Sequence, residues 1–317
     1  ILQWLGEPTL HPELEEMVAL GIRELAGLVG YLRFDTNAVA LTPSRTDRIL
    51  EAVSGVEGPP LLVVFSLDAD TAETYQRVKG RDRFGQAMAN IEHFLARRGE
   101  IPGDEQRVNT QFQFVLQPEN HREVGEFVAR WDRLLRRGRN GIGFNEVMIK
   151  RLSVGTGGEA QAEADALYDR ALREHRLAPR DEPHLHLRIW EDRTWGDGAE
   201  IPGPAAAPAG VAARPPCPAP WKTPVIRWDG ELAVCCADTD RAIPVGNVGD
   251  DGFVSLWRGE AMTRVRLAHL LDTLDELPFC AACGGFAYYD LGPVEVREYL
   301  RDIGRDELWP RISGRLT

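Results

Sequence analysis

The chain has 317 residues and a mass of 35.3 kDa, which is enough to bury a sizeable core and predicts two unequal domains. Its apolar fraction is 43%, and no apolar run approaches the roughly 18 residues that cross a bilayer, so we expect no membrane partner. The net charge of −12 opposes binding to phosphate backbones, which argues against a nucleic-acid partner.

The first residues, ILQWLGEPTLHP, have neither the basic start nor the cleavage site of a signal peptide, so a cytoplasmic location is expected. The chain opens on Ile1 within an apolar run, without an initiator methionine, and we therefore expect it to be a fragment of a longer protein. All five cysteines follow residue 216. Their odd number and tight spacing favour metal or cluster ligation over disulfides.

Short apolar runs alternate with amphipathic runs over the first half of the chain. The expected strands are residues 1–8, 28–37, 60–69, 108–117 and 144–152, and the expected helical segments are 11–25, 42–55, 70–98 and 120–137. Strands that alternate with helices of this length predict an α/β fold with parallel strands, in either an open sheet or a barrel. A further helix is expected at 159–178, and the Pro/Ala-rich run at 201–220 is expected to be a linker.

Three of the predicted strand ends are polar: GEP at 6–8, DTN at 35–37 and SLD at 66–68. In parallel α/β folds the functional groups lie at such ends. Ser66 and Asp68 are two residues apart and are expected to share one strand face.

The run NTQFQFV predicts a strand with two different faces. Asn109, Gln111 and Gln113 alternate with Thr110, Phe112 and Phe114. This alternation indicates aromatic residues against outer helices and amides toward a polar interior that holds a ligand. Further candidates to face a substrate are Asn145 and Arg188, whereas His184 and His186 are expected to be structural.

The cysteine-bearing segment has seventeen residues between Cys217 and Cys235, forty-four between Cys235 and Cys280, and a CxxC that ends at Cys283. A hairpin that turns at 229–230 would bring the first two thiols together. A helix at 255–272 could return the CxxC to the same place, giving four thiolates around one site.

Four-cysteine sites hold zinc or an iron-sulfur cluster. Zinc ribbons usually draw on two tight cysteine pairs, and only the second pair is tight here, so the spacing favours a cluster. Zinc, and then buried unligated cysteines, remain the alternatives. Cys236 is expected to be a packed thiol rather than a ligand, because its side chain would lie on the opposite strand face from Cys235.

Taken together, these motifs resemble the radical S-adenosyl-L-methionine (SAM) enzymes that carry a C-terminal SPASM or twitch domain. LQWLGEPTLHPEL resembles the glycine-glutamate-proline segment on the second barrel strand of the family, DTNA its Thr-Asn-Gly strand end, and SLDADTAETYQRVKGRDRF its fourth-strand signature. The C-terminal part is similar to the auxiliary-cluster module of the family. Twelve residues separate Cys217 from Gly230, four separate Gly230 from Cys235, and VGNV, LWRGE and the CxxC follow.

The resemblance implies that residues 1–152 form a partial (βα)6 radical SAM barrel, which is N-terminally incomplete and begins at the second strand of the family. It implies a helix and linker over 153–216, and a SPASM/twitch domain of β-hairpin and helices over 217–317. It places Gly6, Glu7 and Pro8 near the amino group of SAM, and Ser66 and Asp68 near its carboxylate and ribose. The implied cofactor-binding set also contains Thr36, Asn37 and Gln113. The implied ligands of one auxiliary 4Fe-4S cluster are Cys217, Cys235, Cys280 and Cys283. Without the resemblance, Glu7 is a helix cap and Ser66 an ordinary strand-end hydroxyl.

The family binds its catalytic 4Fe-4S cluster with a CxxxCxxC loop, and no such loop occurs in this sequence. The catalytic cluster is therefore expected only in a complete chain; otherwise the chain is a relative that has lost radical chemistry. Trp4 and Ala38 stand where the family usually has glycine.

The implied function is that of a radical SAM oxidoreductase or maturase. It would use a 5′-deoxyadenosyl radical to abstract hydrogen from a peptide or from a small sugar or aminocyclitol-like substrate. A flavodoxin or ferredoxin would be its electron donor. The alternative is a non-catalytic binding or scaffold protein with a structural four-cysteine zinc or cluster site.

Overall fold

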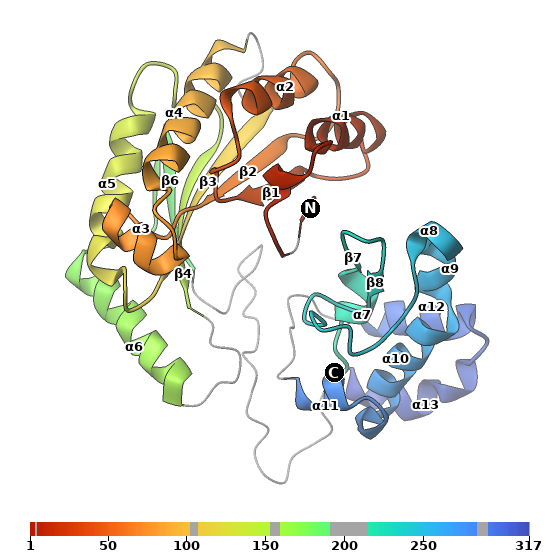
Figure 1. The fold of residues 1–317 in the computed structure, drawn as a ribbon. Helices are drawn as coiled ribbons and strands as arrows, with labels where there is room; N and C mark the ends of the chain where they lie inside the picture. The colour runs from red at the N-terminus through yellow and green to blue at the C-terminus, as the bar shows by residue number, and fades with distance from the viewer. Residues whose placement is uncertain (4, 102–106, 153–158, 191–214, 284–290, 317) are drawn as a thin grey trace. The chain divides into compact units, whose positions relative to one another are not determined.

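The structure is a computed structural model that describes residues 1–3, 5–101, 107–152, 159–190, 215–283 and 291–316 (Figure 1). The chain divides into two compact units, Ile1–Glu191 and Asp192–Thr317. None of the described helices is both long enough and apolar enough to span a membrane.

The first unit is built on a six-stranded sheet. Its strands are β1 (Leu32–Thr36), β2 (Leu61–Ser66), β3 (Val108–Leu116), β4 (Asn145–Arg151), β5 (Arg180–Glu182) and β6 (Leu185–Ile189). They lie in the order β1-β2-β3-β4-β6-β5, and every neighbouring pair is parallel except β5 and β6. The mainly parallel α/β sheet that the sequence predicts is confirmed. In the described residues the edge strands β1 and β5 pair with no further strand.

The strand predicted at residues 1–8 is wrong, because the described residues of that range form no strand. Among the described residues of this segment, one backbone bond reaches the sheet, from Leu2 N to Arg33 O at 2.8 Å. Gly6 then turns the chain with a φ of +97°, and Pro8 has no N–H to give to a strand ladder.

Helices pack on one face of this sheet (Figure 1). The helical elements of the unit are η1 (Pro8–Leu10), α1 (Leu14–Glu24), α2 (Pro43–Val53), α3 (Ala72–Lys79), α4 (Phe84–Glu100), η2 (His121–Glu123), α5 (Val124–Leu135) and α6 (Glu159–Glu174). The helical segment predicted at 70–98 is thus two helices. Gly80 ends the first of them in the left-handed conformation, which a glycine adopts without strain.

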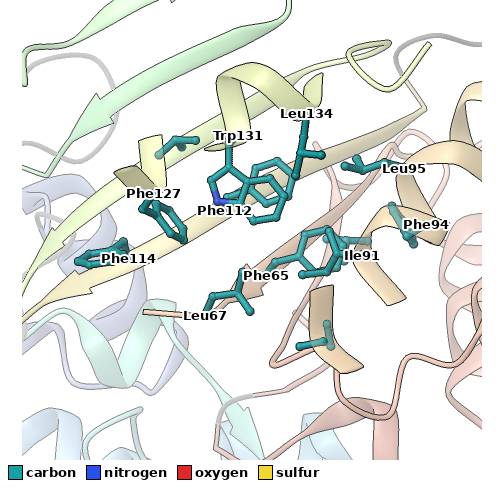
Figure 2. Close-up of a cluster of buried hydrophobic side chains, with 14 of the residues drawn as sticks. Phe65, Leu67, Ile91, Phe94, Leu95, Phe112, Phe114, Phe127, Trp131 and Leu134 are labelled. Carbon is teal, nitrogen blue, oxygen red and sulfur yellow. The ribbon is translucent and has the colours of Figure 1, made fainter. Parts of the chain in front are cut away.

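The core of the first unit is an aromatic layer between sheet and helices (Figure 2). Phe112 stacks on Trp131 with ring centroids 3.8 Å apart, and its other ring neighbour is Phe65 at 5.5 Å. Thr110, Phe112 and Phe114 are buried on β3 while the intervening amide side chains are only half-buried. The predicted alternation of this strand is confirmed.

The second unit contains a hairpin and a set of short helices. Its elements are α7 (Ala219–Lys222), β7 (Val225–Ile226), β8 (Leu232–Ala233), α8 (Val248–Asp251), α9 (Phe253–Arg258), α10 (Glu260–Leu271), η3 (Leu274–Glu276), α11 (Pro278–Ala282), α12 (Pro293–Asp302), η4 (Asp306–Leu308), α13 (Trp309–Ile312) and η5 (Ser313–Arg315). β7 and β8 pair antiparallel, and Gly230 turns between them with a φ of +85°, so the predicted hairpin is confirmed. The helix predicted at 255–272 is divided at Gly259 into α9 and α10.

Candidate functional site

The five cysteines of the second unit come from three places in its fold. Cys217 directly precedes α7, Cys235 and Cys236 follow β8, Cys280 lies in α11, and Cys283 caps the C-terminus of that helix. None of the five forms a disulfide bond with a described residue. Cys217 and Cys235, the first predicted ligand pair, thus lie on either side of the hairpin in the sequence. Cys280 and Cys283, the second pair, lie in α11 and at its C-terminus.

These thiols share one region of the unit. Cys280 belongs to a cluster of buried apolar side chains, and Cys235 packs against that cluster. Burial is the main cause that raises the pKa of the Cys235 thiol to about 11, and the charges of Cys236 and Cys217 contribute to this shift. Burial also raises the pKa of Cys236, with Cys217 and Cys283 adding to the shift. Thiols from all three places thus lie close enough to influence one another.

The thiols are not arranged as a ready coordination shell. Among the described His, Cys, Asp and Glu residues, no group of three or more has the geometry of a metal site. A metal or cluster binds thiolates, so its binding here would release protons from thiols whose raised pKa values oppose ionisation. Four soft sulfur donors remain a suitable set for an iron-sulfur cluster or for zinc.

A buried arginine, which the sequence did not point to, fixes the element next to Cys217. Arg266 in α10 is 3% exposed. Its Nε donates to Pro220 O at 3.0 Å and its Nη1 to Trp257 O at 2.7 Å, and its guanidinium lies 4.5 Å from the centroid of the Trp257 ring. These contacts tie α7 to α9 and α10 and so hold the segment that follows Cys217 in place.

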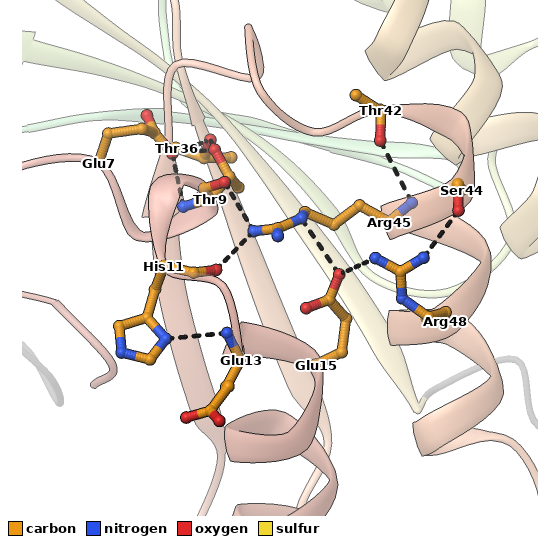
Figure 3. Close-up of polar contacts among 10 residues, drawn as sticks. All are labelled: Glu7, Thr9, His11, Glu13, Glu15, Thr36, Thr42, Ser44, Arg45 and Arg48. Carbon is orange, nitrogen blue, oxygen red and sulfur yellow. Dashed lines mark hydrogen bonds and ion pairs between the residues drawn. The ribbon is translucent and has the colours of Figure 1, made fainter.

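In the first unit, Glu7 bonds to two other predicted cofactor-binding residues, Thr36 (Figure 3) and Asn37. Its Oε1 accepts bonds from Thr9 N at 3.1 Å, Thr9 Oγ1 at 2.5 Å and Thr36 Oγ1 at 2.6 Å, and its Oε2 accepts from Asn37 N at 2.7 Å. Glu7 therefore caps η1, and it also joins the GEP segment to the end of β1. The structure brings Glu7, Thr36 and Asn37 together, as the resemblance implies for a shared site.

Arg45 of α2 holds the loop that carries Glu7 (Figure 3). Its Nη1 donates to Thr9 O at 2.6 Å and to His11 O at 2.8 Å, while its Nε pairs with the buried Glu15 at 3.1 Å. Pro8 is buried at the first position of η1 and Gly6 is exposed. Ala38 has a left-handed φ of 63°, a conformation that suits glycine better.

The carboxylate and the carbonyl oxygen of Asp68 already bond to other residues of the first unit. Its Oδ1 accepts from Val115 N at 2.7 Å, its Oδ2 pairs with Lys79 Nζ at 2.6 Å, and its carbonyl accepts from Asn120 Nδ2 at 2.8 Å. β2 ends at Ser66, and Asp68 lies beyond it with a left-handed φ of 57°. The expectation that Ser66 and Asp68 share a strand face is therefore wrong, because the chain turns between them.

The face of the sheet away from the helices is polar. Gln111 Nε2 donates to Glu146 Oε1, and burial raises the pKa of Glu146. Gln113 lies opposite Ser66 in the register of β2 and β3. Its Oε1 is buried and, among the described residues, has no hydrogen-bond partner. An unsatisfied buried oxygen of this kind is a ready contact for a ligand.

The other candidates are used within the fold. Asn145 is buried on the helix side, where its Oδ1 accepts from Arg98 and Thr110, so its predicted substrate role is wrong. Arg188 pairs with Asp181 at 2.5 Å. The structural interpretation of the two histidines is supported, since His184 contacts Asp132 at 2.9 Å and His186 contacts Asp181 at 2.7 Å.

A cavity of about 1040 Å³ lies at the opposite, amino end of the strands. Its lining includes Phe144, which is 41% exposed and stacks on His186 at 4.6 Å. Of the described cofactor-binding candidates, none lines this cavity, so the chemistry suggested by the motifs lies elsewhere on the sheet.

Comparison with known families identifies the cysteine module. Residues 217–284 match the SPASM model, an iron-sulfur cluster-binding domain. The match contains all five cysteines and the hairpin between the first two of them. No curated protein matches the chain. The first unit lies outside the matched range.

Proposed function

We propose that this chain is part of a radical SAM oxidoreductase or maturase. It has an iron-sulfur cluster-binding SPASM domain at residues 217–284. The observation that carries the proposal is the SPASM match itself, because such domains typically accompany radical SAM enzymes. The parallel sheet of the first unit and the polar ends of its strands are compatible with a radical SAM barrel. The substrate would be a peptide or a small sugar or aminocyclitol-like molecule, from which a 5′-deoxyadenosyl radical abstracts hydrogen.

The residues of the chain would hold and orient the cofactors, which supply the radical and electron-transfer chemistry. Cys217, Cys235, Cys280 and Cys283 would bind one auxiliary 4Fe-4S cluster as thiolates. Glu7 would receive the ammonium group of SAM, since its Oε2 accepts one hydrogen bond from the described residues, that of Asn37 N, and a carboxylate oxygen can accept two.

A strand-end group would complete the SAM site in this proposal. Ser66 and Gln113 lie side by side in register and present a hydroxyl and a carboxamide on the polar face of the sheet. Asp68 would act indirectly, because its carboxylate is already bonded to Val115 N and Lys79.

The first unit has no thiol that could bind the catalytic cluster. Residues 1–216 contain no cysteine, so the thiolates of a catalytic 4Fe-4S cluster would come from outside the 317 residues. We expect a CxxxCxxC motif in the coding sequence shortly upstream of Ile1. A flavodoxin or ferredoxin would deliver the electron. A start codon directly before Ile1 would favour the scaffold alternative.

The test is the metal content of the chain purified without oxygen. We expect about four iron and four acid-labile sulfide per chain, together with the brown absorbance of a 4Fe-4S cluster. Cys217→Ser, Cys235→Ser, Cys280→Ser and Cys283→Ser should each lose most of this iron. Cys236→Ser is the matched control and should retain it.

One outcome would contradict the proposal, and another would change its ligand set. A colourless chain with one zinc and no sulfide would identify a structural zinc site and support the scaffold alternative. Loss of iron in Cys236→Ser together with retention in Cys217→Ser would exchange the roles of these two thiols.

A further inference from the structure

Lys150 differs from the other lysines of the chain in its lack of a carboxylate partner. The sequence contains three lysines, Lys79, Lys150 and Lys222. Lys79 Nζ pairs with Asp68 at 2.6 Å, and Lys222 Nζ pairs with Glu295 at 3.1 Å. Within the described part of the chain, Lys150 Nζ has neither an ion pair nor a hydrogen bond; it lies 4.8 Å from the centroid of the Trp190 ring.

The strand β4 directs Lys150 to the polar face of the sheet. Val147 and Ile149 are buried in the core beneath the helices, so the residues that alternate with them, including Lys150, lie on the other face. In register, Lys150 is opposite Val115 of β3, two residues beyond Gln113. Lys150 and Gln113 are therefore neighbours on one face.

Two more polar side chains beside Lys150 have an oxygen atom without a hydrogen-bond partner among the described residues. Gln113 Oε1 is buried without a hydrogen-bond partner, and the Ser66 hydroxyl, one strand further on, makes no hydrogen bond with any described residue. A cation, a carboxamide and a hydroxyl thus lie on three adjacent strands, and no described residue bonds to Lys150 Nζ, Gln113 Oε1 or Ser66 Oγ. Gln113 Oε1 is also buried, and buried polar atoms of native proteins are normally paired, so this arrangement indicates a ligand.

The carboxylates near Lys150 do not serve as its counter-ion. Burial, together with the charge of Arg33, lowers the pKa of Lys150 to about 8, and Asp35, Asp68 and Glu146 only partly oppose the shift. Each of these three carboxylates already has a partner: Asp35 with Arg33 at 2.6 Å, Asp68 with Lys79 at 2.6 Å, and Glu146 with Gln111.

We propose that Lys150 is the counter-ion for a carboxylate group of a ligand that binds on the polar face of the sheet, with Gln113 and Ser66 as its hydrogen-bonding neighbours. One unpaired ammonium matches a monoanion, whereas a phosphate dianion would leave excess negative charge beside Glu146 and Asp35. An aminocyclitol is cationic and would be repelled by Lys150. Where the bound carboxylate is that of the substrate, the site therefore favours a peptide or amino-acid substrate over an aminocyclitol.

Two carboxylates could occupy this position, that of the methionine moiety of SAM and that of the substrate. Naming these two sources rests on the proposed function, but the carboxylate site itself does not. Its test also needs no iron, so a failure here is distinguishable from a failure of the cluster experiment.

The experiment measures the pKa of Lys150 in the intact chain. Lysine-selective 13C labelling gives three side-chain signals, and Lys150→Arg assigns the one of interest. The chain is titrated with pH in sodium chloride, in sodium acetate of equal ionic strength, with SAM, and with decarboxylated SAM. A carboxylate seated on the ammonium should raise the pKa of Lys150 by about one unit or more. The ion-paired Lys79 and Lys222 are internal controls whose signals should not move.

The outcomes separate the two sources. A rise with SAM but not with decarboxylated SAM assigns the methionine carboxylate. A rise with acetate and none with SAM assigns a carboxylate of the substrate. An unchanged pKa with acetate and SAM, or an equal rise with decarboxylated SAM, overturns the proposal.

Discussion

At the scale of single residues, the two most informative side chains have opposite environments. The Glu7 carboxylate accepts four hydrogen bonds from Thr9, Thr36 and Asn37. The Lys150 ammonium makes none with the described residues. Glu7 therefore has a structural role besides any role toward a cofactor, whereas the burial of Lys150 costs free energy that a bound anion would offset.

The structural role of Glu7 can be measured directly. Glu7→Gln replaces one carboxylate oxygen by an N–H donor, which would face donors from Thr36 or Asn37. We expect the free energy of unfolding of the first unit to fall by about 2 kcal/mol, since hydrogen bonds to charged groups contribute ~1.5–3 kcal/mol each. Urea denaturation at neutral pH provides the measurement.

The matched control is Glu13→Gln, because Glu13 is exposed and its side chain caps no helix. This control should unfold like the parent chain. Equal stability of Glu7→Gln and the parent would show that the η1 cap and the link to β1 contribute nothing, and would leave Glu7 with a ligand-binding role alone.

At the scale of elements, the two faces of β3 have different roles. The side chains beneath the helices belong to the aromatic layer of Phe65, Phe112 and Trp131 (Figure 2). Gln111 and Gln113 lie on the polar face. One strand thus supplies both the packing that stabilises the sheet and the amides that a ligand would contact.

Paired substitutions on β3 test this division. Phe112→Ala removes a fully buried ring that contacts two other rings, and should lower the free energy of unfolding by about 3–5 kcal/mol. Gln113→Ala removes an amide whose oxygen is unsatisfied, and should change it by less than about 1 kcal/mol. Chemical denaturation followed by tryptophan fluorescence compares the two. Similar losses for both variants would contradict the assignment of the faces.

A second link between elements comes from Glu123 at the end of η2. Its carboxylate accepts from Thr71 Oγ1 at 2.7 Å and from Thr74 Oγ1 at 2.6 Å. Burial opposes ionisation of Glu123, but these bonds outweigh it and lower its pKa. Glu123 thereby joins the N-terminus of α3 to the start of α5 and holds the loop after Asp68 in place.

At the scale of the whole molecule, the two units have separate cores. One large cluster of buried side chains lies in the first unit, and two smaller clusters lie in the second. Only the second unit contains cysteines, so only its stability should depend on an iron-sulfur cluster. Ligand binding to the native state stabilises the unit that binds.

Calorimetry tests this independence. We expect two unfolding transitions, of which reconstitution with iron and sulfide raises one Tm by ~5 °C or more, since a few kcal/mol shifts the Tm of a small domain by several degrees. The cluster-dependent transition should be insensitive to Phe112→Ala. The first unit should unfold at the same temperature with and without iron. A single transition, or an iron-dependent rise in both, would show that the units unfold together.

Much of the fold follows from local patterns of sequence. The parallel order of strands and helices, the alternation along β3 and the hairpin at Gly230 were each predicted because they depend on residues two to four positions apart. Local patterns failed where a turn interrupts a regular element: at Gly6 and Pro8, at Gly80, and at Gly259. Each of these positions has a residue that ends an element, and the apolar periodicity on both sides of it obscured the break.

The candidate site was only partly predictable. The sequence by itself determined which thiols, carboxylates and amides exist and which of them end strands. Only the tertiary structure decided which are already engaged: Glu7 with Thr36, Asp68 with Lys79, and Asn145 in the core, while no described residue forms an ion pair with Lys150. Such pairings join residues far apart in the sequence, as between Arg98 and Asn145, which are 47 positions apart. They depend on which strands become neighbours and on how deeply each group is buried, and no local pattern encodes either.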